Sequence, residues 1–288
     1  MGSTLGARLR DGGGRVVVAL DGRSERTRRL SGEAGLEDVG TLAALLREAS
    51  FVLSVVPPEA AVDAATAVAR ESGDARPVVC DLNAVSPATM QRVAAVLGAA
   101  GLDTVDGSIS GPPPRGPGTT RMYLSGPRAG EVAVLPIEGV ERVVVSDAVG
   151  AASAVKMCTA SVYKGRSAVL AQALRTARAH GMVDHVVADL AAAGLADPDR
   201  IGTALGIASA KAWRYVAEME EIAATQAGAG LTPDLFRAMA AVYVELAERA
   251  VAASPEDVPD GLPLGAVLDR LSEAGADPAA EAGPRRAG

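Results

Sequence analysis

Residues 51–71 read FVLSVVPPEAAVDAATAVARE, and this stretch decides the fold. The largely apolar residues 51–56 end at Pro57 and Pro58, and an alanine-rich run follows over 59–71. An unbroken apolar segment of this length is typical of a strand buried on both faces, and the run after it predicts a helix. Because the same alternation recurs along the first half of the chain, we expect a doubly wound parallel sheet covered by helices on both faces.

Apolar runs bounded by turn residues predict the other strands, and polar or proline starts predict the helices between them. The expected strands are 16–20, 51–56, 78–82, 102–106, 120–125 and 140–145, and the expected helices are 41–48, 59–71 and one that opens at Ser86–Pro87.

The sequence pattern changes from alternating strands and helices to helices after Gly150. Residues 151–180 contain no proline and one internal glycine, which predicts a long helix that Gly181 ends. The pattern stays helical to about residue 271, with breaks near 194–198, 228–233 and 254–263. We therefore expect an α/β domain over 1–148, an all-α domain over 149–275 that begins with a long interdomain helix, and a disordered tail over 276–288.

The composition and charge of the chain exclude some classes of function. The chain has 288 residues and a net charge of -7, which argues against a nucleic-acid binder. Its two cysteines lack metal-ligand spacing and indicate reduced thiols in the cytoplasm. With no apolar run of about 18 residues and no signal peptide, we expect no membrane segment.

Ligands of doubly wound sheets bind beyond the carboxyl ends of the strands, so the residues that follow each strand are the candidates. After the first strand, Arg23 and Ser24 favour the 2′-phosphate of NADP, while Asp21 before them favours the ribose hydroxyls of NAD. A solvated turn is the alternative there. Ser110 and Gly111 offer a hydroxyl and backbone N–H groups to a carboxylate, unless they only shape a loop.

Lys156 is the candidate catalytic residue. It follows the small residues of GAASAVK (150–156), which allow a close approach of the helix start. Because only three of the 28 basic residues are lysines, a lysine here favours a site where arginine fails, such as proton transfer. A solvent-exposed helix lysine is the alternative. Arg214 and Glu218, spaced i, i+4, predict a surface ion pair or else the lining of a cleft.

Together these features resemble the β-hydroxyacid dehydrogenase and 6-phosphogluconate dehydrogenase superfamily, in its branch with a helical C-terminal domain of unknown function. Five motifs carry the resemblance, which runs to about Ala247. They are Met1–Gly2 as the end of GxGxMG, Asp21–Ser24 as the NADP-type turn, Asp106–Gly111 (DGSISG) as the substrate-binding DxxxSG signature, Gly150–Lys156 as GxxxxxK with the catalytic lysine, and Glu218–Glu221 as the C-terminal signature.

The resemblance implies a Rossmann-type NADP-binding domain over 1–148 and an NAD(P)-dependent oxidoreductase that acts on a small, acidic substrate. Expected substrate contacts are Ser110, Gly111, Pro112, Thr159, Arg214 and Glu218. Expected cofactor contacts, with NADP preferred over NAD, are Gly2, Ser3, Thr4, Arg23, Ser24, Val56, Pro57, Pro58 and Asn83. A homodimer through the helical domain is implied, and no metal is.

Two departures leave alternatives open. Ala160 stands where the superfamily has asparagine, which puts the usual hydroxyacid substrate in doubt and admits an imine. The chain also opens on a helical run without the first strand and the first glycines of the phosphate loop. A start codon assigned too far downstream, or a trimmed chain, is one interpretation. A non-catalytic binding or scaffold relative that has lost the cofactor is the other.

Overall fold

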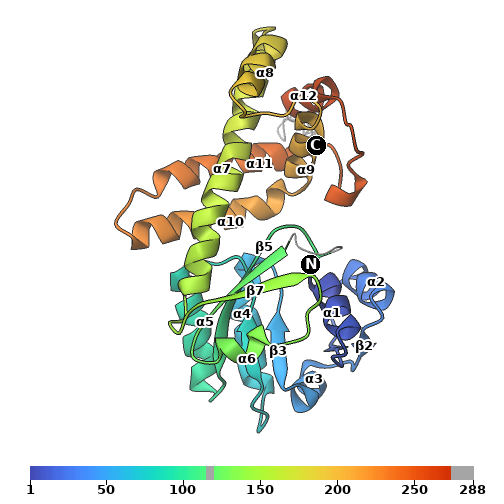
Figure 1. Ribbon diagram of the computed structural model, residues 1–288, viewed down its shortest axis with the longest axis vertical. Helices are drawn as coiled ribbons and strands as arrows, with labels where there is room; N and C mark the ends of the chain where they lie inside the picture. Colours follow the sequence, from blue (N-terminus) through green and yellow to red (C-terminus); the bar gives the residue numbers. More distant parts are fainter. Residues whose placement is uncertain (115–119, 274–288) are drawn as a thin grey trace, which may run out of the picture. The chain divides into compact units, whose positions relative to one another are not determined.

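The computed structural model describes residues 1–114 and 120–273 (Figure 1). The tail predicted over 276–288 lies outside these residues. Two compact units divide the chain. The first takes Met1–Ala160 and Glu221–Pro233, and the second takes Ser161–Glu220 and the chain from Asp234 onward.

The first unit contains a five-stranded sheet in the order β3-β4-β5-β6-β7 and a separate two-stranded sheet, β1-β2. The pairs are parallel except β5–β6, which is antiparallel. The predicted Rossmann-type α/β fold with a following helical region is confirmed, but a wholly parallel sheet is wrong at β6 and β7, which run opposite to β3, β4 and β5. The strands are β1 (Val17–Val18), β2 (Glu37–Asp38), β3 (Phe51–Ser54), β4 (Val78–Asp81), β5 (Thr104–Ser110), β6 (Thr120–Ser125) and β7 (Val140–Ser146).

Helices cover both faces of the larger sheet, because its strands are apolar on both sides. Leu5 of α1 and Val132 of α6 pack with Val105 and Ile109 on one face. Leu46, Val68 and Val93 of α3, α4 and α5 pack with Val79 on the other. The helical elements of this region are α1 (Gly2–Asp11), α2 (Glu25–Glu33), α3 (Leu42–Glu48), η1 (Pro58–Ala60), α4 (Ala61–Glu71), α5 (Pro87–Ala99) and α6 (Ala129–Ala133).

The strand predicted over 16–20 is shorter than expected. It forms only the two residues of β1, which pair with β2, and no described strand pairs with its other edge. Helix α1 connects the two sheets instead. Its Leu5 lies in the core of the larger sheet, and a Cβ at Gly6 would lie 2.9 Å from Leu36 and 3.5 Å from Val16, next to the smaller one.

The second unit is helical, as predicted. The long helix forms over Ala151–Ala179, and Gly181 follows it with a φ of +69°, the left-handed conformation typical of a helix C-terminus. Within the described ranges no helix is both long and apolar enough to cross a membrane. The remaining elements are α7 (Ala151–Ala179), α8 (Val183–Ala192), α9 (Ile201–Ala210), α10 (Ala212–Gly228), α11 (Asp234–Glu248), η2 (Pro255–Asp257) and α12 (Leu264–Ser272).

The compact units do not follow the boundary expected between residues 148 and 149. Helices α7 and α10 each continue from one unit into the other, so the start of α7 and the end of α10 belong to the first unit. A continuous helix carries no sequence signal where its packing partners change. The domain limits of 1–148 and 149–275 therefore stay a prediction.

Candidate functional site

One row of polar side chains crosses the larger sheet. The register pairs a residue on each strand with the next, and the row is Ser54, Asp81, Asp106, Ser125 and Ser146. Strands β3, β4 and β5 run in one direction and β6 and β7 run in the other, and the row lies at the carboxyl ends of β3 and β4. That edge is where ligands of open α/β sheets bind. The row therefore marks the level at which the fold changes from apolar core to candidate site.

Asp106 holds the start of α7. Its carboxylate accepts hydrogen bonds from the backbone N–H of Gly150 (2.9 Å) and of Ser153 (3.0 Å), and from the Ser153 hydroxyl (2.7 Å). The hydroxyl of Ser125 donates to it at 2.9 Å and accepts from the N–H of Ala152. A carboxylate satisfies the free N–H groups of a helix start and is stabilised by the helix dipole.

Lys156 lies on the second turn of the same helix. Its Nζ donates to the carbonyl oxygen of Ile109 at 2.7 Å, which brings it to the end of β5. Because side chains alternate along a strand, Ser110 projects to the same face as Asp106 and Ser108, the face that holds α7. Ser108 confirms this direction, since its hydroxyl donates to the carbonyl of Ala152. The structure thus brings Lys156 and Ser110 together.

Gly111 and Pro112 follow directly. Gly111 has a φ of +107°, a conformation that side chains rarely adopt, so glycine is required for the chain to turn away from β5 there. The carbonyl of Pro112 accepts from the hydroxyl of Thr120 at 2.7 Å. Ser110 is half-buried, and Gly111 and Pro112 are exposed, so this turn is open beside Lys156.

Thr159 and Ala160 complete this face of α7 in the first unit. The hydroxyl of Thr159 lies within 3.1 Å of the carbonyls of Val155 and Lys156 on its own helix. Ala160 is buried. Neither position gives Lys156 the amide that the superfamily's asparagine would supply.

Asn83 holds the loop after β3. Its backbone N–H and side-chain amide donate to the two oxygens of Asp81, at 2.9 and 2.8 Å, and its Oδ1 accepts from the N–H of Val56 at 2.6 Å. Since Asn83 is buried and its amide is engaged, it fixes the turn of Val56, Pro57 and Pro58 rather than presenting its own side chain. Its expected contact with the cofactor stays a prediction.

The other cofactor candidates lie at helix starts. Gly2, Ser3 and Thr4 form the first turn of α1, and a Cβ at Gly2 would lie 3.5 Å from Val55 at the end of β3. Arg23 and Ser24 are exposed between β1 and α2, where the Ser24 hydroxyl accepts from the N–H of Thr27 as the N-cap.

Glu218 and Arg214 lie in the second unit. Glu218 is buried and forms an ion pair with Lys164, whose Nζ also lies 4.7 Å from the ring centre of Tyr215. The guanidinium of exposed Arg214 is 4.0 Å from Glu218, at the limit of an ion pair. The predicted Arg214–Glu218 contact is thus secondary to a buried pair that the sequence did not indicate, and a substrate role for either residue stays a prediction.

Glu221 is a contact that the sequence did not reveal. Its carboxylate accepts from the N–H of Ser86 at 2.6 Å and from the hydroxyl of Thr89 at 2.9 Å, at the start of α5. The partners are 135 and 132 residues apart, so no spacing could show the contact. It fixes the segment that follows β4 and Asn83.

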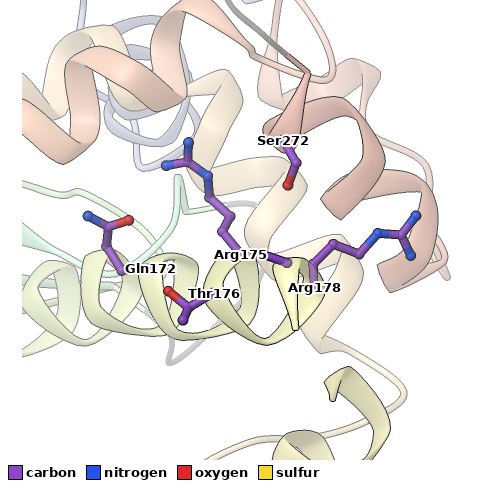
Figure 2. Close-up of a pocket in the computed structure, with 6 residues that line it drawn as sticks. Gln172, Arg175, Thr176, Arg178 and Ser272 are labelled. Atoms are coloured by element: carbon purple, nitrogen blue, oxygen red, sulfur yellow. The ribbon is translucent and has the colours of Figure 1, made fainter. Parts of the chain in front are cut away.

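One hollow lies elsewhere, in the second unit (Figure 2). Its volume is about 530 Å³, and no predicted site residue lines it. The side chains of Arg175 and Arg178 point in different directions in Figure 2, and each is paired, with Glu245 and Asp269 respectively. Throughout the described ranges no group of three or more metal-ligating side chains is found. The lining residues are Gln172, Arg175, Thr176, Arg178, Ala179 and Ser272.

Two family models match the chain. The NAD binding domain of 6-phosphogluconate dehydrogenase matches residues 1–130, and a domain of unknown function, DUF1932, matches residues 177–246. These two matches, one in each half of the chain, confirm the resemblance drawn from the motifs. An uncharacterized 28.5 kDa protein of Methanothermus fervidus is 28% identical over 173 residues, 60% of this chain. The match spans 65% of that relative, slightly less than two thirds.

Solved structures share the fold. A conserved protein of unknown function, described as similar to 3-hydroxyacid dehydrogenases, is 28% identical with a TM-score of 0.63, over 85% of this chain and 92% of that one. A 3-hydroxyisobutyrate dehydrogenase of Mycobacterium tuberculosis with L-serine is 19% identical with a TM-score of 0.60, over 94% and 95%. A reductive aminase of Aspergillus terreus with NADPH is 17% identical with a TM-score of 0.55, over 93% and 95%. Two of these three neighbours are thus named as enzymes, one a dehydrogenase and one a reductive aminase.

Asp81 provides a test of the polar row. Burial raises its pKa to about 6 from 3.8, although hydrogen bonds from Asn83 lower it. The folded protein therefore binds this proton more tightly than the unfolded chain does. Protonated Asp81 makes its full contribution to the free energy of unfolding below about pH 4, and this contribution is lost as the pH rises through 6. A shift of about two units corresponds to roughly 3 kcal/mol in the free energy of unfolding.

We expect wild-type stability, measured by urea unfolding, to fall relative to Asp81→Asn between pH 4.5 and 7.5. Asp63→Asn, on the exposed side of α4, corrects for the lost charge. Parallel curves for wild type and Asp81→Asn would contradict the assignment.

Proposed function

We propose that the protein is an NADP-dependent oxidoreductase in which Lys156 is the general acid and base. The observation that carries the proposal is the position of Lys156, whose Nζ lies 2.7 Å from the Ile109 carbonyl at the end of β5, beside Ser110 and the exposed turn at Gly111. The match of residues 1–130 to the NAD binding domain of 6-phosphogluconate dehydrogenase supports it.

The site residues have separate roles in the proposed reaction. Ser110 and the backbone of Gly111 hold a carboxylate or similar polar group of a small substrate, through a hydroxyl and an N–H. Lys156 protonates the oxygen of the carbonyl as it is reduced, or takes the proton of the alcohol in the reverse direction. The bound nicotinamide supplies or accepts the hydride. A dehydrogenase needs a group that gives or takes a proton as the hydride moves, and the amine of Lys156 can be that group in a dinucleotide-binding fold.

The donor set fits a dinucleotide phosphate. Arg23 and Ser24 present a guanidinium and a hydroxyl, both exposed, after β1 and at the start of α2, which suits a 2′-phosphate. The first turn of α1, at Gly2, Ser3 and Thr4, offers backbone N–H groups to a pyrophosphate. A neighbour in the fold holds NADPH, which also supports this preference.

An imine carbon is the second candidate for the reacting centre. The observation that favours it is Ala160, buried where the superfamily's asparagine would assist a hydroxyacid. The reductive aminase among the structural neighbours supports this alternative. A non-catalytic scaffold is the alternative function, and the Lys156→Ala experiment below tests it as well.

We also propose a homodimer through the helical unit, in the cytoplasm. Val162 and Val169 are exposed on α7 and lie seven residues apart, hence on one helix face, with Tyr163 exposed beside them. Clustered exposed apolar side chains favour burial against a partner. Neither cysteine, Cys80 or Cys158, forms a disulfide, which suits a reducing compartment.

Lys156→Ala tests the catalytic role. We expect kcat to fall by about 10²–10⁴, the usual contribution of a general acid, when a panel of small keto acids, hydroxy acids and imines is assayed. NADPH affinity, followed by nucleotide fluorescence, should change little because Lys156 does not hold the cofactor. Cys158→Ala, exposed on the same helix, is the matched control. Unchanged turnover in Lys156→Ala, or a wild-type protein that binds no nucleotide, would favour the scaffold.

Arg23→Ala tests the cofactor preference. Loss of a charge-assisted hydrogen bond to the 2′-phosphate should weaken NADPH binding by roughly 10- to 100-fold and leave NADH binding nearly unchanged. Arg29→Ala, which removes an arginine paired with Glu33 on α2, is the control. An equal loss for both nucleotides would remove the basis for an NADP preference.

Val169→Arg tests the dimer. Light scattering should give about twice the 28.9 kDa chain mass for the wild type and the single-chain mass for the variant, because a buried charge opposes association. Ala188→Arg, exposed on α8, should leave the mass unchanged. A wild-type protein that is monomeric at all concentrations would exclude the dimer.

A further inference from the structure

Asp106 is the first residue of the DGSISG motif, whose counterpart in relatives is a substrate-binding signature. In this structure its side chain has no access to solvent. Four donors contact the carboxylate: the hydroxyl of Ser125, the N–H of Gly150, and the N–H and hydroxyl of Ser153. A carboxylate has about four acceptor positions. A substrate group therefore finds no access to Asp106, whose carboxylate is already bound by four groups of the protein.

The groups bound by Asp106 are those that set the direction of α7. Gly150 has a φ of +104°, and a Cβ there would lie 3.5 Å from Pro87 of α5, so the backbone enters the helix through a conformation reserved for glycine. The N–H of Gly150 and of Ser153 both end on the same carboxylate oxygen. The turn that begins α7 is thus pinned at two places to one atom of β5.

Ser153 and Lys156 are three residues apart on the helix and so lie on one face. Asp106 and Ile109 are likewise three residues apart on β5. The helix is therefore fastened to the strand at two levels, Ser153 to Asp106 at 2.7 Å and Lys156 to Ile109 at 2.7 Å. A rotation or slide of the first turn would move Nζ away from the Ile109 carbonyl and from Ser110.

We propose that Asp106 is a positioning residue, which fixes the start of α7 so that Lys156 stays at the end of β5, and that it does not bind substrate. The inference rests on the proposed catalytic role of Lys156 for its kinetic part only. Ser125 belongs to the same device, because its hydroxyl bridges Asp106 and the N–H of Ala152.

The first experiment measures kinetics of Asp106→Asn, which is isosteric but removes the charge and one acceptor. A misplaced catalytic group costs up to about 10² in rate, so we expect kcat to fall by roughly 10- to 100-fold while KM and NADPH affinity stay within about twofold. A substrate-binding carboxylate would instead raise KM with kcat nearly unchanged, and that result would overturn the proposal. Thr41→Ala, which removes the N-cap of α3, controls for lost stability.

The second experiment needs no turnover. The chain has three lysines, so acetylation by acetic anhydride, which transfers an acetyl group to an amine and releases acetate, followed by peptide mass spectrometry, reports each Nζ separately. Asp106→Asn should speed the labelling of Lys156 several-fold, and Ser153→Ala should do so to a smaller extent. Lys164 and Lys211 should keep their rates and serve as internal references.

Unchanged labelling of Lys156 in both variants would overturn the proposal, whatever the kinetics show. If the wild type turns over no substrate, the proposed oxidoreductase fails, and the labelling result alone decides the role of Asp106. Should Asp106→Asn not fold, Ser153→Ala decides both experiments, since it removes only the 2.7 Å hydroxyl bond.

Discussion

A buried carboxylate at the beginning of α7 is the constraint on which the candidate site depends. Asp106 is without solvent contact, and burial of a charge is costly unless hydrogen bonds and a favourable field compensate. Here four donors and the positive end of a 29-residue helix compensate. Strand β5 and helix α7 are consequently held in one arrangement, and this arrangement sets the position of the Lys156 amine.

The other side chains of the polar row also hold neighbouring segments of the chain through hydrogen bonds. Asp81 holds Asn83, which in turn holds the N–H of Val56. Ser146 accepts from the N–H of Ala148 just before α7. Four of the five side chains bind backbone N–H groups that the strand ladder does not satisfy, and Ser54 accepts from the side-chain amide of Asn83. The row is thus the boundary between a core that needs only apolar packing and loops that need specific partners.

Local patterns predicted most of the fold. Residues 51–54 and 78–81 form strands because continuous apolar runs stop at turn residues, and α7 forms because nothing in 151–179 interrupts it. The reversed direction of β6 and β7 could not be predicted, since an apolar run does not state whether it pairs parallel or antiparallel. Lys156 and Ser110 were identified because their types suit the chemistry. The roles of Asp106, Asn83 and Glu221 depend on partners that the fold alone brings together, up to 135 residues away.

The small β1–β2 sheet has a consequence for dynamics. Its two strands have two residues each and share no described ladder with the larger sheet, so α1 and the ion pair of Arg15 with Glu48 of α3 connect it to the rest. Exposed ion pairs contribute little to stability. This corner, with Arg23 and Ser24 at its edge, should open as a separate local unit at lower free energy than the five-stranded core. A phosphate that closed the arginine turn would then act first on the least stable part of the molecule and transmit order inward through α1.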